Sequence, residues 1–269
     1  MNNLLIIVRG GGDLASGVIN RLFKSGFDVI CLESKNPSAI RRTVSYCSAV
    51  YENTATVEEV TAVKCENLGQ IKLCLQKRRV PVIVDESCEI LKYIRPFALV
   101  DAIIAKKNMG TKSDMAPLTI GLGPGFCAGK DVNYVVETLR GHNLGRIISN
   151  GCAAENTGVP GDICGQSALR VIHSPCDGKL KIIKDITSSV KKGDLLAYVD
   201  ETPVAATING IVRGMIYEGY NVFKGMKIID IDPRPEERNN CFTISDKARC
   251  ISGSVLEIIA GSYFKMCRN

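Results

Sequence analysis

A glycine-rich turn near the start of the chain has the residue types and spacing of a phosphate-binding loop. It follows an apolar segment at 4–8 and precedes a helical pattern at 14–24. Glycine allows a phosphate to approach the backbone closely, and a helix N-terminus offers free N–H groups. We therefore expect a nucleotide-type anion here, held by Gly10, Gly11, Gly12, Asp13 and Leu14. The alternative is a turn that only packs the helix on the sheet.

An acidic residue stands where a dinucleotide site would need one. Glu33 ends the next apolar segment, 27–32, and follows the glycine turn by about 20 residues, the spacing at which a carboxylate accepts hydrogen bonds from a ribose. Asp13 argues the other way, because a carboxylate beside a phosphate site repels the phosphate.

A second glycine-rich loop follows the apolar segment 118–122, and we expect it to precede a helix over 132–140. Its candidate binding residues are Gly121, Gly123, Gly125, Phe126 and Gly129. Cys127 lies in the same loop, either as a reactive thiol or as a small buried side chain. Two such loops would share the carboxyl edge of one sheet, where open α/β sheets bind ligands, although a purely structural turn remains the alternative.

The elements that carry these loops alternate between strand and helix patterns. Strands are expected at 4–8, 27–32, 80–84, 98–105, 118–122 and 146–149, with helical patterns at 14–24, 57–60, 68–76 and 132–140. Alternation of this kind predicts an α/β domain over 1–165 with a Rossmann-like, doubly wound parallel sheet. A loop rich in Gly, Pro and Asn over 150–165 is expected near its end.

A duplicated sequence follows over 166–235. Asp177–Leu180 matches Asn209–Val212, and Val190–Asp194 matches Val222–Met226, both at an offset of 32 residues. This stretch resembles the biotinyl/lipoyl barrel-sandwich fold, but no lysine lies between Lys192 and Lys224 to carry a cofactor. A third segment, 236–269, contains a helical pattern over 245–265, which we expect to pack back on the first domain.

Composition places the chain among ordinary globular proteins. It has 269 residues, of which 45% are apolar and 23% charged, and a net charge of +6. The basic residues form no tract, and no apolar run is long enough for a membrane helix, so we expect a cytoplasmic protein that binds neither nucleic acid nor membrane. The 12 cysteines are scattered without metal-ligand spacing, which predicts reduced thiols and no metal.

Seven motifs together resemble the YqeB-type accessory proteins of the selenium-dependent molybdenum hydroxylase system. They lie at Arg9–Gly17, Ala39–Ser45, Val100–Lys106, Ile120–Phe126, Glu137–His142, Asn156–Gly161 and Ile244–Arg249. The resemblance covers nearly the whole chain.

The resemblance implies an accessory or maturation role for a selenium-dependent molybdenum hydroxylase, with the apoenzyme or other maturation proteins as partners and homo-oligomers as a further possibility. It also implies a first domain similar to that of xanthine dehydrogenase accessory proteins and a molybdopterin-type cofactor or an adenine dinucleotide as ligand. Arg9, Arg41, Arg42 and Lys106 would complement such an anion. It assigns no catalytic residue. An NAD(P)-dependent oxidoreductase and a non-catalytic scaffold are the alternatives.

Overall fold

The computed structural model describes residues 4–156, 165 and 168–268. The chain forms two compact units, and each unit is built from segments that are separated in the sequence. The first unit contains 1–37, 45–156 and 244–269, and the second contains 38–44 and 157–243. The sequence instead predicts boundaries at 165 and 235. Half of the loop expected over 150–165, residues 157–164 with Cys164 among them, lies outside the described residues.

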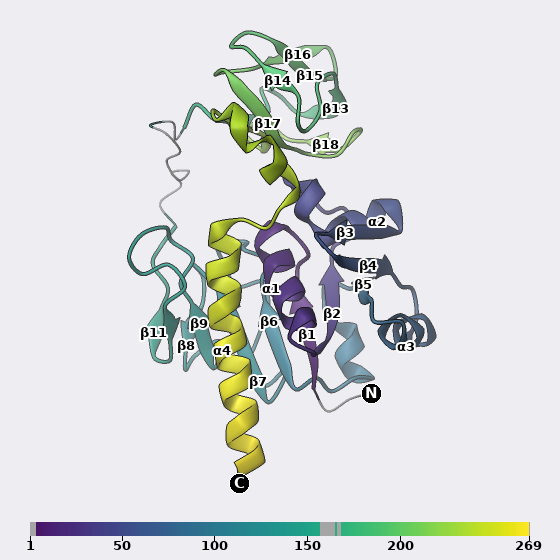
Figure 1. Ribbon diagram of the computed structural model, residues 1–269, viewed down its shortest axis with the longest axis vertical. Helices are drawn as coiled ribbons and strands as arrows, with labels where there is room; N and C mark the ends of the chain where they lie inside the picture. Colours follow the sequence, from purple (N-terminus) through teal and green to yellow (C-terminus); the bar gives the residue numbers. More distant parts are fainter. Residues whose placement is uncertain (1–3, 157–164, 166–167, 269) are drawn as a thin grey trace. The chain divides into compact units, whose positions relative to one another are not determined.

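A nine-stranded sheet forms the centre of the first unit (Figure 1). Its strand order is β10-β9-β7-β6-β1-β2-β5-β4-β3, and all neighbouring pairs are parallel except the outer pairs β10–β9 and β4–β3. The strands are β1 (Leu5–Arg9), β2 (Asp28–Glu33), β3 (Thr54–Val57), β4 (Val60–Lys64), β5 (Val80–Val84), β6 (Ala98–Asp101), β7 (Leu118–Leu122), β9 (Tyr134–Val136) and β10 (Ile147–Ile148). The unit is therefore α/β with a mostly parallel sheet, as the alternating pattern predicts.

Helices cover both faces of this sheet because β1 and β2 are apolar on both faces. Leu5, Ile7 and Ile30 pack with Ile71 of α3 (Leu68–Gln76) and Ile90 of the 3-10 helix η3 (Glu89–Lys92). α1 (Asp13–Lys24) connects β1 to β2 and contacts both strands. Gly26, just beyond α1, has a φ of +96°, the left-handed conformation that commonly ends a helix.

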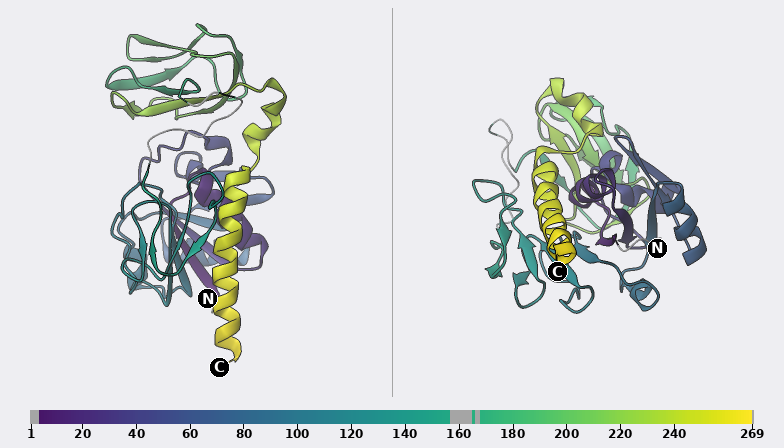
Figure 2. Two further views of the ribbon diagram at one scale, coloured as in Figure 1. Left: turned by 90° about the vertical axis from the view of Figure 1, so that its left-hand side faces the viewer. Right: turned by 60° about the horizontal axis from the view of Figure 1, so that its bottom comes forward.

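The C-terminal helix α4 (Asp246–Arg268) packs against α1 within the first unit (Figures 1 and 2). A Cβ at Gly17 of α1 would lie 2.8 Å from the Cβ of Ala248, so the two helices approach closely at this point. Arg21 donates from Nε to the Ser252 hydroxyl at 2.9 Å. Ile251, Val255 and Ile259 are each 0% exposed. α4 therefore completes one face of the first unit.

Two segments with helical spacing are not helices. Residues 57–60 form the turn between β3 and β4, where Glu58 has a φ of +52°. Residues 134–136 form β9, which pairs with β7 and β10, so the helix expected over 132–140 is wrong. The Asn133 side chain accepts from Thr119 N of β7 at 2.7 Å, which ties this segment to the sheet.

The second unit contains two four-stranded, mainly antiparallel sheets, ordered β12-β19-β17-β14 and β16-β15-β13-β18. Their strands are β12 (Val171–His173), β13 (Gly178–Ile182), β14 (Ser189–Val190), β15 (Leu195–Val199), β16 (Thr202–Ala205), β17 (Gly210–Met215), β18 (Asn221–Val222) and β19 (Lys227–Asp232). The first half of the duplication contains β12 to β15, and the second half contains their counterparts β16 to β19 in the same order. When every strand is exchanged for its counterpart in the other half, the strand order of one sheet becomes that of the other. Each half therefore contributes two strands to each sheet.

Side chains follow the same relation. Asp177 accepts from Lys224 N at 2.7 Å, and Asn209, its equivalent, accepts from Lys192 N, the equivalent of Lys224, at 2.8 Å. The duplication seen in the sequence is thus a two-fold pseudosymmetry of the second unit.

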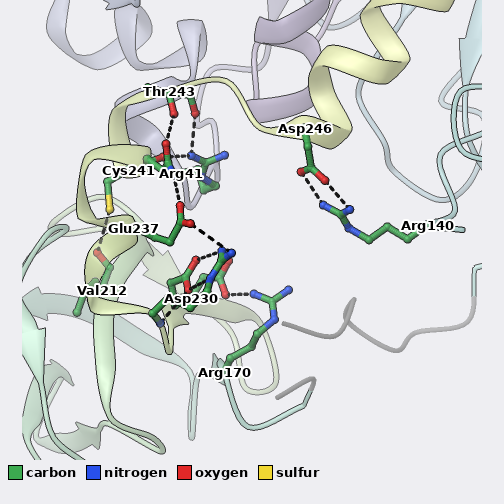
Figure 3. Close-up of polar contacts among 12 residues, drawn as sticks. Arg41, Arg140, Arg170, Val212, Asp230, Glu237, Cys241, Thr243 and Asp246 are labelled. Atoms are coloured by element: carbon green, nitrogen blue, oxygen red, sulfur yellow. Dashed lines mark hydrogen bonds and ion pairs between the residues drawn. The ribbon is translucent and has the colours of Figure 1, made fainter. Parts of the chain in front are cut away.

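An early segment, 38–44, completes the second unit. Thr43 donates to Cys241 O, and Met215 N donates to Ile40 O at 2.8 Å. Cys241 belongs to the 3-10 helix η4 (Pro235–Phe242), and its Sγ lies 3.9 Å from Val212 O of β17 (Figure 3). This explains why residues close to β2 in the sequence group with the second unit.

Candidate functional site

The first glycine turn lies between the end of β1 and the start of α1, where the sheet order changes direction. Gly10 has a φ of +94°, and a Cβ there would lie 3.1 Å from the backbone of Ala102 and Ile103. At Gly11 a Cβ would lie 2.8 Å from Cys47 N. Gly12, the N-cap of α1, has no atom within 4 Å of an added Cβ. The turn is therefore closed by protein at its first two glycines and open at the third.

Glu33 lies directly against this turn. Its carboxylate accepts from Gly11 N and from Ser34 N, both at 2.7 Å. Burial raises the pKa of Glu33, although these two backbone hydrogen bonds lower it in part. Glu33 thus contacts the glycine turn, but its carboxylate takes up the N–H of Gly11 that a phosphate would use, and its contact with a ribose stays a prediction. The open position at Gly12 remains the place where a ligand can approach the backbone.

Arg9 is a buried structural cation. Its guanidinium forms an ion pair with Asp101 at 3.2 Å and donates to Thr111 Oγ1 and to Glu86 O. The Thr111 hydroxyl also binds the Asp101 carboxylate at 2.6 Å. Burial raises the pKa of Asp101, against the lowering effects of Thr111 and Arg9. Arg9 is 4% exposed, so this cluster fastens the loops after β5 and β6 to the end of β1.

The second glycine loop is tightly packed against protein. An added Cβ would lie 2.4 Å from the Phe126 ring at Gly121, 2.2 Å from Thr138 Oγ1 at Gly123 and 2.5 Å from Lys107 Cα at Gly125. Phe126 itself is buried in a small apolar cluster with Val132 and Val135. Gly129 is open, with a φ of +81°.

No helix follows this loop. Asp131, directly before the helix expected over 132–140, accepts from Cys127 N at 2.9 Å and so belongs to the loop. The geometry favours the structural alternative for this loop, and its role in binding stays a prediction.

Two of the expected anion contacts belong to the second unit. Arg41 donates to Asn240 O at 2.8 Å and to Thr243 O at 3.1 Å (Figure 3). Arg42 donates to Met215 O at 2.8 Å and pairs with Asp185. Both guanidinium groups bind groups of that unit. Lys106 is exposed in the loop after β6, which also carries Ala102 and Ile103.

Two cations that the sequence does not mark as candidates, Lys247 and Arg140, belong to the surroundings of the first glycine turn. Lys247 lies one residue before the close contact of α4 with Gly17, and its charge interacts with Asp13 at the start of α1. Burial lowers the pKa of Lys247, with Arg140 as the next cause. Arg140 forms a bidentate pair with Asp246 at 2.7 and 2.8 Å (Figure 3). No local pattern marks these cations, because only the packing of α4 brings Lys247 to α1.

A groove of about 300 Å³ lies farther along α1 and α4. Three cations line it, and each has a partner: Arg21 binds Ser252, Lys24 binds Glu59 and Arg249 binds Ile244 O. The groove begins at Gly17 and extends to Ser25, so it lies along the part of α1 beyond the glycine turn.

Two cysteines form a disulfide, contrary to the expectation of reduced thiols throughout. Cys127 of β8 (Cys127–Ala128) is bonded to Cys152 of β11 (Gly151–Cys152), and the two residues are directly paired in an antiparallel ladder. The nine other cysteines among the described residues form no disulfide. In the described ranges, no three His, Cys, Asp or Glu side chains come together as a metal site.

This chain has a relative among known sequences. The uncharacterized protein YqeB of Escherichia coli strain K12 is 47% identical over 256 residues, a match that covers 95% of this chain and 47% of YqeB. The chain is homologous to part of YqeB. It spans about half the length of YqeB, 47%, so the activity and partners of full-length YqeB do not transfer to it directly. No family model matches the chain.

The similar solved structures are distant from this chain. The product-bound ectoine utilization protein EutE (DoeB) of Ruegeria pomeroyi is 13% identical with a TM-score of 0.24, and the match covers 85% of each chain. An aspartoacylase family protein of Mesorhizobium loti is 11% identical with a TM-score of 0.25, covering 86% of this chain and 85% of that one. Among the described helices, none is both long and apolar enough to cross a membrane.

Proposed function

We propose that the first unit binds a nucleotide-containing ligand at the carboxyl edge of its sheet, at the Gly10–Gly12 turn. The observation that carries this proposal is Gly12. It follows a buried parallel strand, begins α1 and has no atom within 4 Å of an added Cβ, although both preceding glycines are closely packed. A phosphate can approach the backbone at such a position and meet the positive end of the helix dipole.

The strand order supports an adenine nucleotide as the ligand. Strands β5-β2-β1-β6-β7 follow the 3-2-1-4-5 order of the Rossmann-like sheet that we propose for this unit, and ligands of such sheets bind where the order reverses. Here the reversal lies between β1 and β6. Glu33 lies beside the glycine turn, where a carboxylate can accept hydrogen bonds from ribose hydroxyls. A carboxylate at this place favours a ribose without a 2′-phosphate.

The wider role that we propose is accessory. It rests on the resemblance to YqeB-type proteins of the selenium-dependent molybdenum hydroxylase system, with the apoenzyme or another maturation protein as partner. The nucleotide part of a molybdopterin dinucleotide could bind at Gly12, as proposed above for a nucleotide. Its anionic pterin part fits less well, because Arg9 is paired with Asp101, and Arg41 and Arg42 bind groups of the second unit. Lys106 is the exposed member of the four expected cations.

For the second unit we propose a lipoyl-like barrel sandwich that serves as a docking module. The supporting observation is the exchange of strands between its two halves. The turn joining the halves contains Asp200 and Glu201 and offers no amine for a cofactor. An NAD-dependent oxidoreductase remains the second candidate for the whole chain, favoured by the position of Glu33 against the glycine turn.

The test compares two glycine variants with the wild type by calorimetric titration with AMP, ADP-ribose and NAD. Gly12→Val should abolish binding while the first unit still folds, because its Cβ has free space in the protein and occupies the ligand's place. Gly253→Val, at a glycine of α4 that also has free space, controls for the valine itself and should leave binding intact. Equal affinity of Gly12→Val and the wild type would refute the site.

A companion measurement identifies the natural ligand. Mass spectrometry of small molecules that co-purify from the native host separates the three classes: a pyranopterin supports the accessory role, an adenine dinucleotide without a pterin supports the oxidoreductase, and the absence of any ligand supports a scaffold.

A further inference from the structure

We propose that Cys127 and Cys152 form a reversible thiol–disulfide exchange site, at which a dithiol reductant opens the β8–β11 ribbon of the first unit. The proposal is independent of the nucleotide site.

The geometry of the pair makes it accessible to exchange. The two residues are directly opposed in an antiparallel ladder, with their Cα atoms 3.9 Å apart, so the ladder itself keeps the two sulfurs close together. Cys152 is exposed, and Cys127 is partly exposed. A disulfide with a sulfur at the surface can be attacked by an external thiolate.

The two sides of the ribbon are held very differently. β8 is anchored without the disulfide: Phe126 and Ala128 belong to a buried apolar cluster, and Cys127 O accepts from Asp131 N at 2.9 Å. β11 has both of its residues exposed. In the segment after β11, Ala153 N donates to Phe126 O at 3.3 Å, Ala154 N donates to Glu137 Oε2 at 2.8 Å, and the Ala153 side chain packs, partly buried, against the Phe126 cluster. Reduction should therefore release β11 and leave β8 in place.

The position of β11 in the chain gives this release a consequence. The segment of the first unit that contains β11 ends at residue 156, and the chain then enters the second unit. The disulfide fixes the backbone four residues before this exit. The oxidation state of the pair thus determines how firmly the end of that segment is attached to the first unit.

The exchange step balances with one dithiol. One thiolate of the reductant attacks the sulfur of Cys152, the more exposed of the two residues, forms a mixed disulfide and releases Cys127 as a thiol after protonation. The second thiol of the reductant then attacks its own sulfur in the mixed disulfide and releases Cys152. The reductant leaves as a cyclic disulfide, and two electrons and two protons have passed to the protein.

The chain supplies a matched control pair. Cys65 and Cys74 interact through their side chains and are both free thiols, but they are only 4% and 6% exposed. The proximity of Cys74 lowers the pKa of the Cys65 thiol. The two pairs therefore differ in oxidation state and in solvent access.

The experiment incubates the full chain in buffers with graded ratios of reduced to oxidised dithiothreitol, alkylates it and measures each cysteine by mass spectrometry. The Cys127–Cys152 peptide should convert to two alkylated thiols in one reversible transition, whereas Cys65 and Cys74 should remain unalkylated throughout in the folded protein. Hydrogen exchange of residues 150–154 should speed up at least tenfold on reduction, with residues 126–129 unchanged.

A Cys152→Ser variant separates reversible exchange from a static bond. In every buffer it should show the fast exchange of the reduced wild type at residues 150–154. The proposal is overturned if the two cysteines are alkylated even under fully oxidising conditions, if the disulfide survives excess dithiothreitol in the folded protein, or if reduction leaves the exchange of β11 unchanged.

Discussion

Removing one isoleucine from α4 should destabilise the first unit strongly. Ile259 is 0% exposed, whereas Phe264, five residues later on the same helix, is 60% exposed. Truncation of a buried isoleucine to alanine costs about 2–5 kcal/mol, because apolar contact is lost and a cavity remains. An exposed side chain away from special features changes stability by at most about 0.5 kcal/mol. We therefore expect the free energy of unfolding to fall by about 2–5 kcal/mol in Ile259→Ala and to change little in Phe264→Ala.

A second truncation, Ile251→Ala, tests whether the losses of stability at two positions of α4 are independent. Ile251 is also 0% exposed and lies about 12 Å from Ile259 along the axis, at about 1.5 Å per residue. At this separation the two losses should add to within about 0.5 kcal/mol in the double variant.

The assay is hydrogen exchange in increasing urea, read by mass spectrometry on peptides from β1 and β6, because it reports the unfolding of the first unit separately. If Ile259→Ala leaves the exchange of these central strands unchanged, α4 does not stabilise the sheet, and the argument from its burial is wrong.

Two further predictions concern Glu33 and the second unit. Burial holds the pKa of Glu33 above its unfolded value of about 4.3, so the stability contributed by the protonated carboxyl is fully present below that value and is lost as the pH rises through the folded pKa. Glu33→Gln should therefore flatten this part of the pH dependence in urea unfolding, and an unchanged profile would show that Glu33 is not its source. The second unit should stay unmodified: intact mass after expression with active biotin and lipoate ligases should equal the sequence mass, and an adduct would contradict the argument from the missing lysine.

The first β–α–β unit could be predicted from the sequence because every signal in it is local. Apolar runs mark β1 and β2, helical spacing marks α1, and Gly26 ends the helix. The duplication could also be predicted, because the strands of its two halves are related by the same offset of 32 residues as the sequence motifs. The candidate glycine turn and its carboxylate partner Glu33 belong to the same local unit, and the structure brings them together.

The remaining features depend on contacts between distant residues. Residues 132–140 have helical spacing, yet pairing with β7 and β10 makes a strand of their centre, so tertiary structure overrides local pattern. The β3–β4 turn uses Glu58 in a left-handed conformation, without the Gly or Asn that usually marks such a turn. Arg41 binds Asn240 O, 199 positions away, and nothing near Arg41 signals that partner.

The exchange of strands in the second unit has a consequence for its origin and for its dissection. Because each half supplies two strands to both sheets, neither half contains a complete sheet alone. The arrangement is what a short peptide would form as an intertwined homodimer, later fused in tandem by duplication of its gene. Cleavage at the turn of Asp200 and Glu201 should accordingly give two fragments that are unfolded separately and regain their structure only when mixed, each serving as the other's template.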